Sequence, residues 1–452
     1  MNFWELPAHG PSDAVLVDVD GTVIDRTALL AQVRVHESRL TGFGQHSFGF
    51  LLCANRVEDI ALLLACLRLG HVPLLLAADM PAAQLDALSA HYRPDWIAGR
   101  DSQPGVVPLA GLSSPPPKLH PSLGLLLSTS GSTGSPRLVR LSRNALQANA
   151  ASIAEYLTLG PGERAITSLP MNYSYGLSVI NSHLASGGLL VLNNHSVISR
   201  EFLERLNAYG ATSMAGVPYT YQMLARTGFF KQPAPTLRTL TQAGGKMDER
   251  MTRLVVDAAQ ANGMRFFVMY GQTEASARIS YVPHDRLRDK IGSIGIAIPG
   301  GTLSVAHDSG ELIYEGPNVM LGYAERPEDL ALGDELGGRL ATGDLGRVDE
   351  DGFFYITGRL KRFVKVSGNR IGLDEVEQAL QMHLQAPVSV GGKDDALAVW
   401  IESSDPSMIG AAGTFLRDQF MIHHSMAKLR LVDHLPLLPT GKKDYSPLLN
   451  SQ

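Results

Sequence analysis

A stretch rich in Ser, Thr and Gly follows an apolar run and has the composition of a phosphate-binding loop. It reads LLLSTSGSTGSPRLVRLS, with a helical pattern resuming at Ser142. Such a loop presents free backbone N–H groups, hydroxyls and a cation together, and these suit a chain of phosphates. It is not a Walker loop, because no G-K-[ST] ends it. A flexible Ser/Gly linker is the alternative, but linkers do not normally separate a buried strand from a helix. The candidate phosphate-binding residues are Thr129, Ser130, Gly131, Ser132, Thr133, Gly134 and Arg137.

A second motif, VLVDVDGTVIDR at residues 15–26, has two interpretations. Asp18 and Asp20 form the D-x-D-G-T pattern of a haloacid-dehalogenase-type phosphatase. The same letters predict a β-hairpin, because Asp-Gly between two β-type runs is a strong turn signal. Such a phosphatase also needs a lysine and a second acidic pair nearby, and the only candidate, GKDDA at 392–396, lies far downstream. We therefore interpret Asp18 and Asp20 as hairpin residues, and expect the same turn at Asp351-Gly352.

The bulk composition is that of a soluble enzyme with more than one domain. The chain has 452 residues, a formal charge of -5 and 44% hydrophobic residues, enough for a large core. Its Lys and Arg residues are dispersed, which argues against a nucleic-acid partner. No signal-peptide pattern opens the chain and no apolar run reaches the ~20 residues of a membrane span, so we expect a cytoplasmic protein. Cys53 and Cys66 lie in apolar surroundings and are expected to be small core residues.

Helical periodicity alternates with continuous apolar runs, which is typical of layered α/β folds with parallel strands. LGLLLS, AITSLP, GLLVL and RFFVMYG are predicted strands, and SSPPPKLHP is a predicted surface loop before Leu123. Residues 248–262 predict a helix that begins after Asp248 and ends at Gly263. Its expected apolar face comprises Met251, Leu254, Val255, Ala258 and Ala259.

Near residue 300 the pattern changes to short β-type runs with Gly-rich turns, which predicts a small β-rich subdomain. The charged segment RLKRFVKVSGNR then follows Gly358. We expect a large N-terminal domain of layered α/β sheets over residues 1–358. A small, mobile α+β C-terminal domain is expected over 359–452.

The Ser/Thr/Gly loop resembles the phosphate-binding signature of the adenylate-forming superfamily, which joins acyl-CoA synthetases, peptide-synthetase adenylation domains and firefly luciferases. That signature usually has Lys-Gly after the proline, where this chain has Arg137 and Leu138. The charge is kept, although Arg and Lys are not interchangeable. Further landmarks of the superfamily follow in order over roughly residues 120–450. Each landmark alone could be an ordinary structural residue, but their order and spacing together favour membership of the superfamily.

The resemblance implies a nucleotide site. AGG at 243–245 and YGQTE at 270–274 resemble its adenine-site segments, placing Tyr270 against the adenine ring, Thr273 at the α-phosphate and Glu274 on Mg²⁺. The flanking site residues implied by the same similarity are Gly244, Gly245, Gly271 and Gln272.

Three later motifs complete this similarity. ATGDLG resembles the motif whose aspartate, here Asp344, accepts both ribose hydroxyls, a task suited to two carboxylate oxygens. GRLKR resembles the segment with the nucleotide-contacting Arg359 and the hinge residue Lys361. LPLLPTGKKDYSPL resembles the motif with the catalytic lysine, which the alignment of Gly441 assigns to Lys442. Taken singly, Asp344 could be a turn residue and Lys442 a solvated charge.

The implied chemistry is attack of a substrate carboxylate on the α-phosphorus of ATP, which releases pyrophosphate and forms an acyl-adenylate. An anion must approach an anion, so catalysis requires positioning and positive charge. Mg²⁺, Arg137 and Lys442 would supply the charge, and closure of the small domain would deliver the lysine. The acyl group would then pass to coenzyme A or to the phosphopantetheine thiol of a carrier protein. The short chain without a fused carrier domain weakly favours a separate carrier protein.

The acid is expected to contact the segment LPMNYSYGLSVINSHLASGG through Tyr173, Ser174 and Gly176. By the resemblance, Ser174 stands where amino-acid-activating relatives have an aspartate for the substrate ammonium, and Tyr173 replaces a histidine common in acyl-CoA synthetases. Burying an ammonium without that carboxylate would be costly, which favours an aryl or acyl acid. A stand-alone amino-acid adenylating enzyme is the alternative. A nucleotide-binding regulator without turnover is a further one, given the departures at Arg137 and Tyr173.

Overall fold

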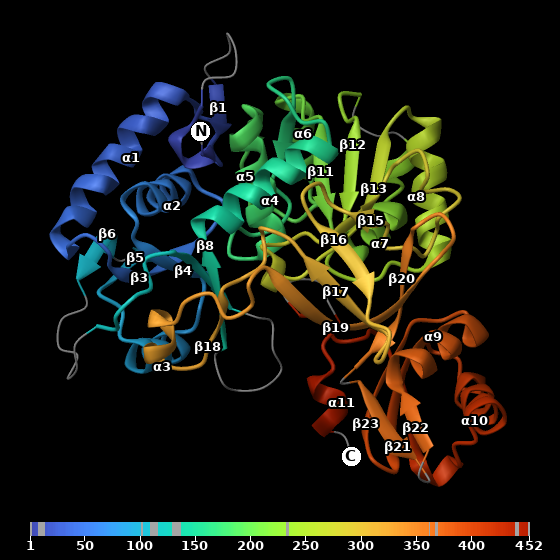
Figure 1. Cartoon of the computed structure of the whole chain (residues 1–452). Coiled ribbons are helices and arrows are strands. Elements are labelled where there is room, and N and C mark those ends of the chain that lie inside the picture. The colour runs from blue at the N-terminus through green and yellow to red at the C-terminus, as the bar shows by residue number, and fades with distance from the viewer. Residues whose placement is uncertain are drawn as a thin grey trace. The chain divides into compact units, whose positions relative to one another are not determined.

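The chain divides into two compact units (Figure 1). The computed structural model describes residues 2–7, 14–100, 103–108, 116–128, 137–231, 235–360, 362–366, 369–438 and 443–450. The first unit comprises Met1–Leu303 and Tyr314–Leu340, and the second comprises Ser304–Ile313 and Ala341–Gln452. The domain boundary expected after residue 358 remains a prediction. Helices and strands alternate through the first unit, so the expected α/β class is confirmed.

A seven-stranded sheet forms one layer of the first unit. Its order is β18-β8-β7-β4-β3-β5-β6, and the central pairs β3–β4 and β4–β7 are parallel. Alternate residues of β3 face opposite sides, as in any strand: Phe48 and Phe50 join a core cluster with Tyr92 of α3, whereas Leu51 joins the central core. The strands are β3 (Phe48–Cys53), β4 (Val72–Ala77), β5 (Trp96–Arg100), β6 (Gln103–Pro108), β7 (Leu123–Ser128), β8 (Leu138–Ser142) and β18 (Gly322–Ala324).

Strand β8 was not predicted from the sequence, which was expected to pass directly from the Ser/Thr/Gly loop into a helix. LVRLS is a strand antiparallel to β7, with Leu127 opposite Val139. It is a strand because its apolar side chains alternate between two cores, Leu138 on one side and Val139 and Leu141 on the other. Only then does α4 (Arg143–Tyr156) begin, with Ser142 Oγ accepting a hydrogen bond from the Ala145 N–H as its N-cap.

A nine-stranded sheet forms a second layer, in the order β15-β14-β13-β12-β11-β9-β10-β1-β2. From β13 to β1 all neighbours are parallel, so their carboxyl ends lie at one edge. The segments that follow β12 and β13 are therefore neighbours. The strands are β1 (Ala14–Val17), β2 (Val23–Asp25), β9 (Arg164–Ile166), β10 (Leu189–Val191), β11 (Ser213–Gly216), β12 (Thr239–Gln242), β13 (Arg265–Tyr270), β14 (Ser280–Val282) and β15 (Ile296–Ala297).

The hairpin interpretation of the Asp-rich motif is confirmed. Strands β1 and β2 are antiparallel, with Leu16 opposite Ile24. The connection turns at Gly21, whose φ of 92° favours glycine, and Asp20 Oδ1 accepts a hydrogen bond from the Thr22 N–H. Asp351-Gly352 likewise separates the antiparallel strands β19 and β20.

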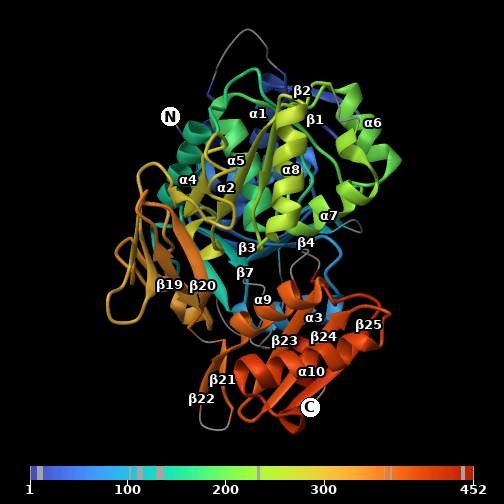
Figure 2. The ribbon, with the colours of Figure 1, turned by 90° about the vertical axis from the view of Figure 1, so that its right-hand side faces the viewer.

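Helices cover both faces of the nine-stranded sheet. Residues of α2, α4 and α5 share the central core with Phe267 of β13, whereas Phe266 on the opposite face contacts Tyr221 of α7. Helices α7 and α8 lie side by side (Figure 2). Helix α8 begins after its Asp248 N-cap as predicted, but Leu254 is 44% exposed. The predicted apolar face was therefore partly wrong, and Thr252 and Val256 are buried there. The helices of this unit are η1 (Phe3–Glu5), α1 (Arg26–Leu40), η2 (Thr41–Phe43), α2 (Val57–Leu69), α3 (Ala82–Tyr92), α4, α5 (Ser174–Ser186), α6 (Arg200–Ala208), α7 (Pro218–Arg226), η3 (Phe229–Lys231), α8 (Glu249–Ala261), η4 (Thr273–Ala275) and η5 (Pro327–Ala331).

The second unit has the α+β character expected of the C-terminal region. It holds most of the four-stranded sheet β16-β17-β19-β20, the hairpin β21-β22 and the sheet β23-β24-β25. Apolar residues of α9 and α10 share one core with the last sheet. The elements are β16 (Thr302–Val305), β17 (Glu311–Glu315), β19 (Arg339–Val348), β20 (Phe354–Arg359), β21 (Phe363–Val366), β22 (Asn369–Gly372), α9 (Leu373–Leu384), β23 (Val388–Lys393), β24 (Ala396–Glu402), α10 (Ser407–Phe420), η6 (His424–Met426), β25 (Ala427–Val432) and α11 (Ser446–Asn450).

The two cysteines are core residues, as expected. Cys53 and Cys66 are free and buried, and burial raises the pKa of both thiols. Among the described helices, none has the length and hydropathy that a bilayer span requires.

Candidate active site

The glycines after β12 allow a close approach by a tyrosine. Gly244 has a φ of 84°, and a Cβ there would lie 2.5 Å from the Tyr173 hydroxyl oxygen. Gln242 Nε2 donates a hydrogen bond to the Gly245 carbonyl and closes the turn. A side chain at Gly244 would therefore displace Tyr173 from this edge of the sheet.

The loop after β13 folds back on itself and presents Thr273 and Glu274. Its backbone bonds run from the Ala275 N–H to the Gln272 carbonyl and from the Ser276 N–H to the Thr273 carbonyl, both at 3.0 Å. A Cβ on Gly271 would lie 1.8 Å from the Ala277 carbonyl oxygen, so only glycine fits. Gln272 Nε2 donates to the Tyr270 hydroxyl at 3.1 Å, which joins two of the predicted nucleotide residues.

The structure brings the predicted acid-binding and phosphate-binding residues together. Ser174 Oγ and Thr273 Oγ1 lie 3.2 Å apart, although they are 99 residues apart in sequence. Ser174 begins α5, and Gly176 allows this first turn to pack on the preceding backbone, because a Cβ there would lie 2.2 Å from the Pro170 carbonyl oxygen. Burial raises the pKa of Tyr173 to about 12 against the opposing positive charge of Arg278. Its phenol is therefore neutral at physiological pH.

Tyr323 connects Glu274 with Arg137. The Tyr323 hydroxyl donates to Glu274 Oε1 at 2.8 Å, and Arg137 Cζ lies 3.4 Å from the centroid of the Tyr323 ring. Burial and the nearby Glu274 carboxylate raise the pKa of Tyr323, which keeps it a donor. Strand β18 holds it beside β8, opposite Val139. The predicted cation and the predicted magnesium ligand thus belong to one cluster.

The residues at Glu274 are compatible with a magnesium ion carried by a nucleotide. The described residues contain no group of three His, Cys, Asp or Glu side chains suited to a metal. Magnesium sites often combine one or two carboxylates with waters and substrate phosphates. In the described part of the chain, Tyr323 is the hydrogen-bond partner of Glu274 Oε1, and Oε2 is available as such a ligand.

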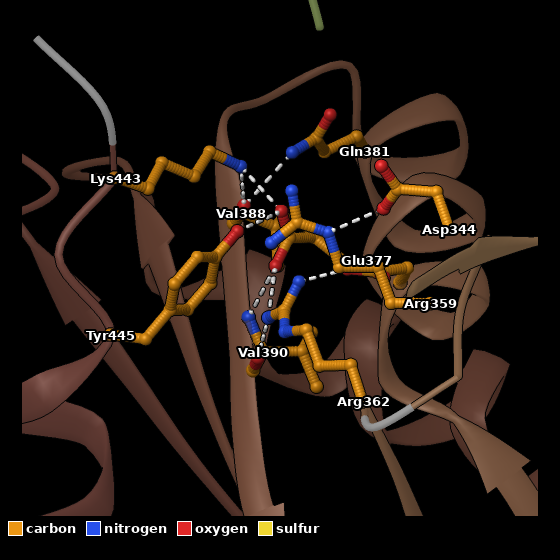
Figure 3. Close-up of polar contacts among 10 residues, drawn as sticks. Asp344, Arg359, Arg362, Glu377, Gln381, Val388, Val390, Lys443 and Tyr445 are labelled. Carbon is orange, nitrogen blue, oxygen red and sulfur yellow. Dashed lines mark hydrogen bonds and ion pairs between the residues drawn. The ribbon is translucent and has the colours of Figure 1, made fainter. Parts of the chain in front are cut away.

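In the second unit, Asp344 and Arg359 form an ion pair (Figure 3). They lie opposite each other on β19 and β20, and Arg359 Nε donates to Asp344 Oδ1 at 2.9 Å. The Asp344 side chain is 2% exposed and that of Arg359 64%. The hydroxyl of Thr342 accepts from the Asp344 N–H, which orients the aspartate further. The two residues predicted to contact the nucleotide are therefore partners of each other.

The C-terminal segment is held by Glu377 of α9 (Figure 3). Glu377 Oε1 accepts from Lys443 Nζ at 2.7 Å and from the Tyr445 hydroxyl at 3.0 Å. Its Oε2 accepts from Arg362 Nη2 at 3.1 Å and from the Val390 N–H at 2.9 Å. Lys443 is thus engaged in an ion pair. Lys442, residues 129–134 and Lys361 lie outside the described residues and remain predictions.

Sequence reasoning missed Tyr323, Glu377 and Arg278. No sequence motif marks Tyr323 or Glu377, because each contacts residues that are distant in the sequence. Arg278 had one, because it is the single charge in the apolar stretch ASARISYV, and the structure buries it to 2% exposure.

Comparisons with known proteins are consistent with this site. Residues 100–324 match the family model "AMP-binding enzyme". The chain is 30% identical over 375 residues to a sulfoacetate–CoA ligase of Cupriavidus necator, covering 77% of this chain and 71% of that protein. It is 29% identical over 346 residues to a feruloyl-CoA synthase of an Amycolatopsis species, covering 70% and 67%.

A solved structure has the same fold. It is the o-succinylbenzoate CoA synthetase of Bacillus subtilis in complex with its acyl-adenylate intermediate, with a TM-score of 0.80, 20% identity and coverage of 100% of this chain and 98% of that one. The same enzyme has also been solved with ATP and a magnesium ion, with a TM-score of 0.78, 20% identity and the same coverage.

Proposed function

The chain belongs to the AMP-binding enzyme family of the adenylate-forming superfamily, and on that premise we propose that it activates a carboxylic acid with ATP and transfers the acyl group to a thiol. The acid carboxylate attacks the α-phosphorus of ATP, pyrophosphate leaves, and an acyl-adenylate forms. The thiol then attacks the acyl carbon and AMP leaves. The observation that carries this proposal is the contact of Ser174 with Thr273, beside Glu274.

Each residue has a physical task in this reaction. The hydroxyl of Thr273 donates to an α-phosphate oxygen, and the Gly271 loop holds it in place. Magnesium, when bound, offsets the negative charge of the phosphates, and Glu274 would hold it. Arg137, stacked on Tyr323, supplies a cation at the end of the predicted phosphate loop. Lys442 is proposed to stabilise charge on the reacting phosphate, and Asp344 and Arg359 to contact the ribose.

Coenzyme A is the acceptor we favour, because the curated relatives named above are coenzyme A ligases. A carrier-protein phosphopantetheine presents the same thiol and stays an alternative. An amino-acid substrate is less well supported, since the position next to Thr273 is the neutral Ser174, which gives an ammonium no opposite charge.

The test is acid-dependent ATP–pyrophosphate exchange across a panel of aryl, acyl and amino acids. We expect exchange with at least one aryl or acyl acid, and a loss of ~100-fold or more in Lys442→Ala, the scale of removing one charge-stabilising group. Lys428→Ala, at an exposed lysine of β25 in the same unit, is the matched control and should keep the exchange. Exchange that survives Lys442→Ala would contradict the lysine assignment, and no exchange with any acid would contradict the proposed function. Coenzyme A and carrier proteins can then be compared by thioester formation.

A further inference from the structure

A buried arginine that has no acidic partner among the described residues lies beside the proposed reaction centre. Arg278 follows the turn at Ala277 and is 2% exposed. Its Nη1 donates to the Ala277 carbonyl at 3.2 Å, and its Cζ lies 4.2 Å from the centroid of the Tyr175 ring. In the part of the chain that the structure describes, its Nε is buried without a hydrogen-bond partner, and no ion pair includes Arg278.

Such an arginine is incompletely satisfied. A guanidinium keeps its charge in proteins and has five N–H donors, and burial removes the water that would otherwise solvate it. The groups around it are neutral. Burial raises the pKa of Tyr156 and Tyr175 to about 12 each, against the charge of Arg278, and burial lowers the pKa of His183. These neighbours supply π-faces and hydroxyls but no negative charge.

Arg278 also lines a cavity of ≈ 20 Å³. The cavity lies between α5 and the strands β11, β12 and β13, with Ser178, Ser182, Thr241 and Met269 in its wall. A volume of this size admits about one water-sized group, and the flexible Met269 side chain offers further room. Polar groups in the wall and a cation at its edge suit a compact anion.

The cavity is close to the proposed acid site. Ser178 is one helical turn along α5 from Ser174, so the two side chains share a face about 6 Å apart, and Ser174 contacts Thr273. Tyr173, which approaches Gly244, is near enough to Arg278 for its pKa to respond to the arginine's charge. The proposed acid site and the cavity that Arg278 lines therefore lie along the same face of α5, about one helical turn apart.

We propose that Arg278 is a specificity residue that binds a second carboxylate at the far end of the substrate, so that the enzyme activates a dicarboxylic acid. The inference rests on the proposed function and narrows its substrate class. The planar guanidinium binds a carboxylate through two parallel hydrogen bonds, and Nε, now without a partner, is one of the available donors. The bound carboxylate supplies the negative charge that the protein around Arg278 lacks.

The test is calorimetric titration of the full chain with dicarboxylic acids of graded length and with their mono-methyl esters, which lack the second charge and carry one additional methyl group. We expect at least one diacid to bind about 10- to 100-fold more tightly than its ester, the range of a charge-assisted hydrogen bond. In Arg278→Met this ratio should fall to about one. Arg253→Met, at an exposed arginine of α8, is the matched control and should keep the ratio.

Equal binding of diacid and ester by the unaltered chain would overturn the proposal, as would binding of neither. A ratio unchanged in Arg278→Met would also overturn it. If Arg278→Met does not fold, the comparison of diacid with ester in the unaltered chain still tests the proposal. Arg278→Lys keeps the charge without the planar fork of the guanidinium, so its ratio of diacid affinity to ester affinity should be intermediate. Pyrophosphate exchange with monocarboxylic acids but no preference for diacids would leave the proposed function standing and reject the role of Arg278.

Discussion

Lys443 Nζ donates a hydrogen bond to Glu377 Oε1 at 2.7 Å and to the Val388 carbonyl at 2.6 Å. This places the residue after Lys442 in an ion pair at the edge of β23. Tyr445 reaches the same carboxylate oxygen, so two residues anchor the segment. Lys443 thus has a structural role as an anchor of this segment, and we expect Lys442 to have the catalytic role.

Glu377→Gln should destabilise the protein by about 3 kcal/mol at pH 7, because removing one partner of a buried ion pair leaves the others uncompensated. Burial alone would raise the pKa of Glu377, but Lys443 and Arg362 hold it below its ordinary value of 4.5. The stabilisation is therefore present above about pH 4.5 and is lost as the pH falls through the folded-state pKa.

Urea unfolding of the full chain between about pH 3 and 7 measures this effect. Glu375→Gln, at an exposed position on the same helix, is the control and should change the unfolding free energy by no more than about 0.5 kcal/mol. A Glu377→Gln protein with unaltered stability would contradict the role assigned to this carboxylate.

Tyr323→Phe should weaken nucleotide binding without unfolding the protein. The ring that Arg137 stacks on remains, but Glu274 loses its hydrogen-bond donor, which is worth about 1 kcal/mol or a ~5-fold change. We expect the KM for magnesium–ATP in pyrophosphate exchange to rise by that factor. Tyr219→Phe, at an exposed tyrosine, should leave it unchanged. Equal KM values for the two variants would show that Tyr323 does not position Glu274.

Gly271→Ala should remove exchange activity and lower the melting temperature, because the new methyl group would meet the Ala277 carbonyl oxygen at 1.8 Å. Backbone cannot rotate away as a side chain can, so the loop that presents Thr273 must open. Gly160→Ala introduces a methyl group with nothing within 4 Å and is the matched control. Thermal unfolding and exchange should be measured together, and normal values of both for Gly271→Ala would refute this account of the loop.

The sequence alone determined the features that depend on neighbours along the chain. The hairpin at Gly21 follows from the φ that Asp-Gly turns need, and the start of α8 follows from the Asp248 carboxylate that caps it. The α/β class follows from the alternation of apolar patterns, and the family from the order of its motifs. The roles of Lys442 and of residues 129–134 remain predictions at this level.

Only the tertiary structure decided features that depend on packing between distant segments. The LVRLS run is a strand because two cores receive its side chains, and Leu254 is exposed because the neighbours of α8 bury Thr252 and Val256 instead. The contacts of Tyr323 with Glu274, and of Glu377 with Lys443, join residues 49 and 66 positions apart. The environment of Arg278 is likewise set by the fold, since its burial, and the lack of a nearby carboxylate among the described residues, depend on segments distant in the chain.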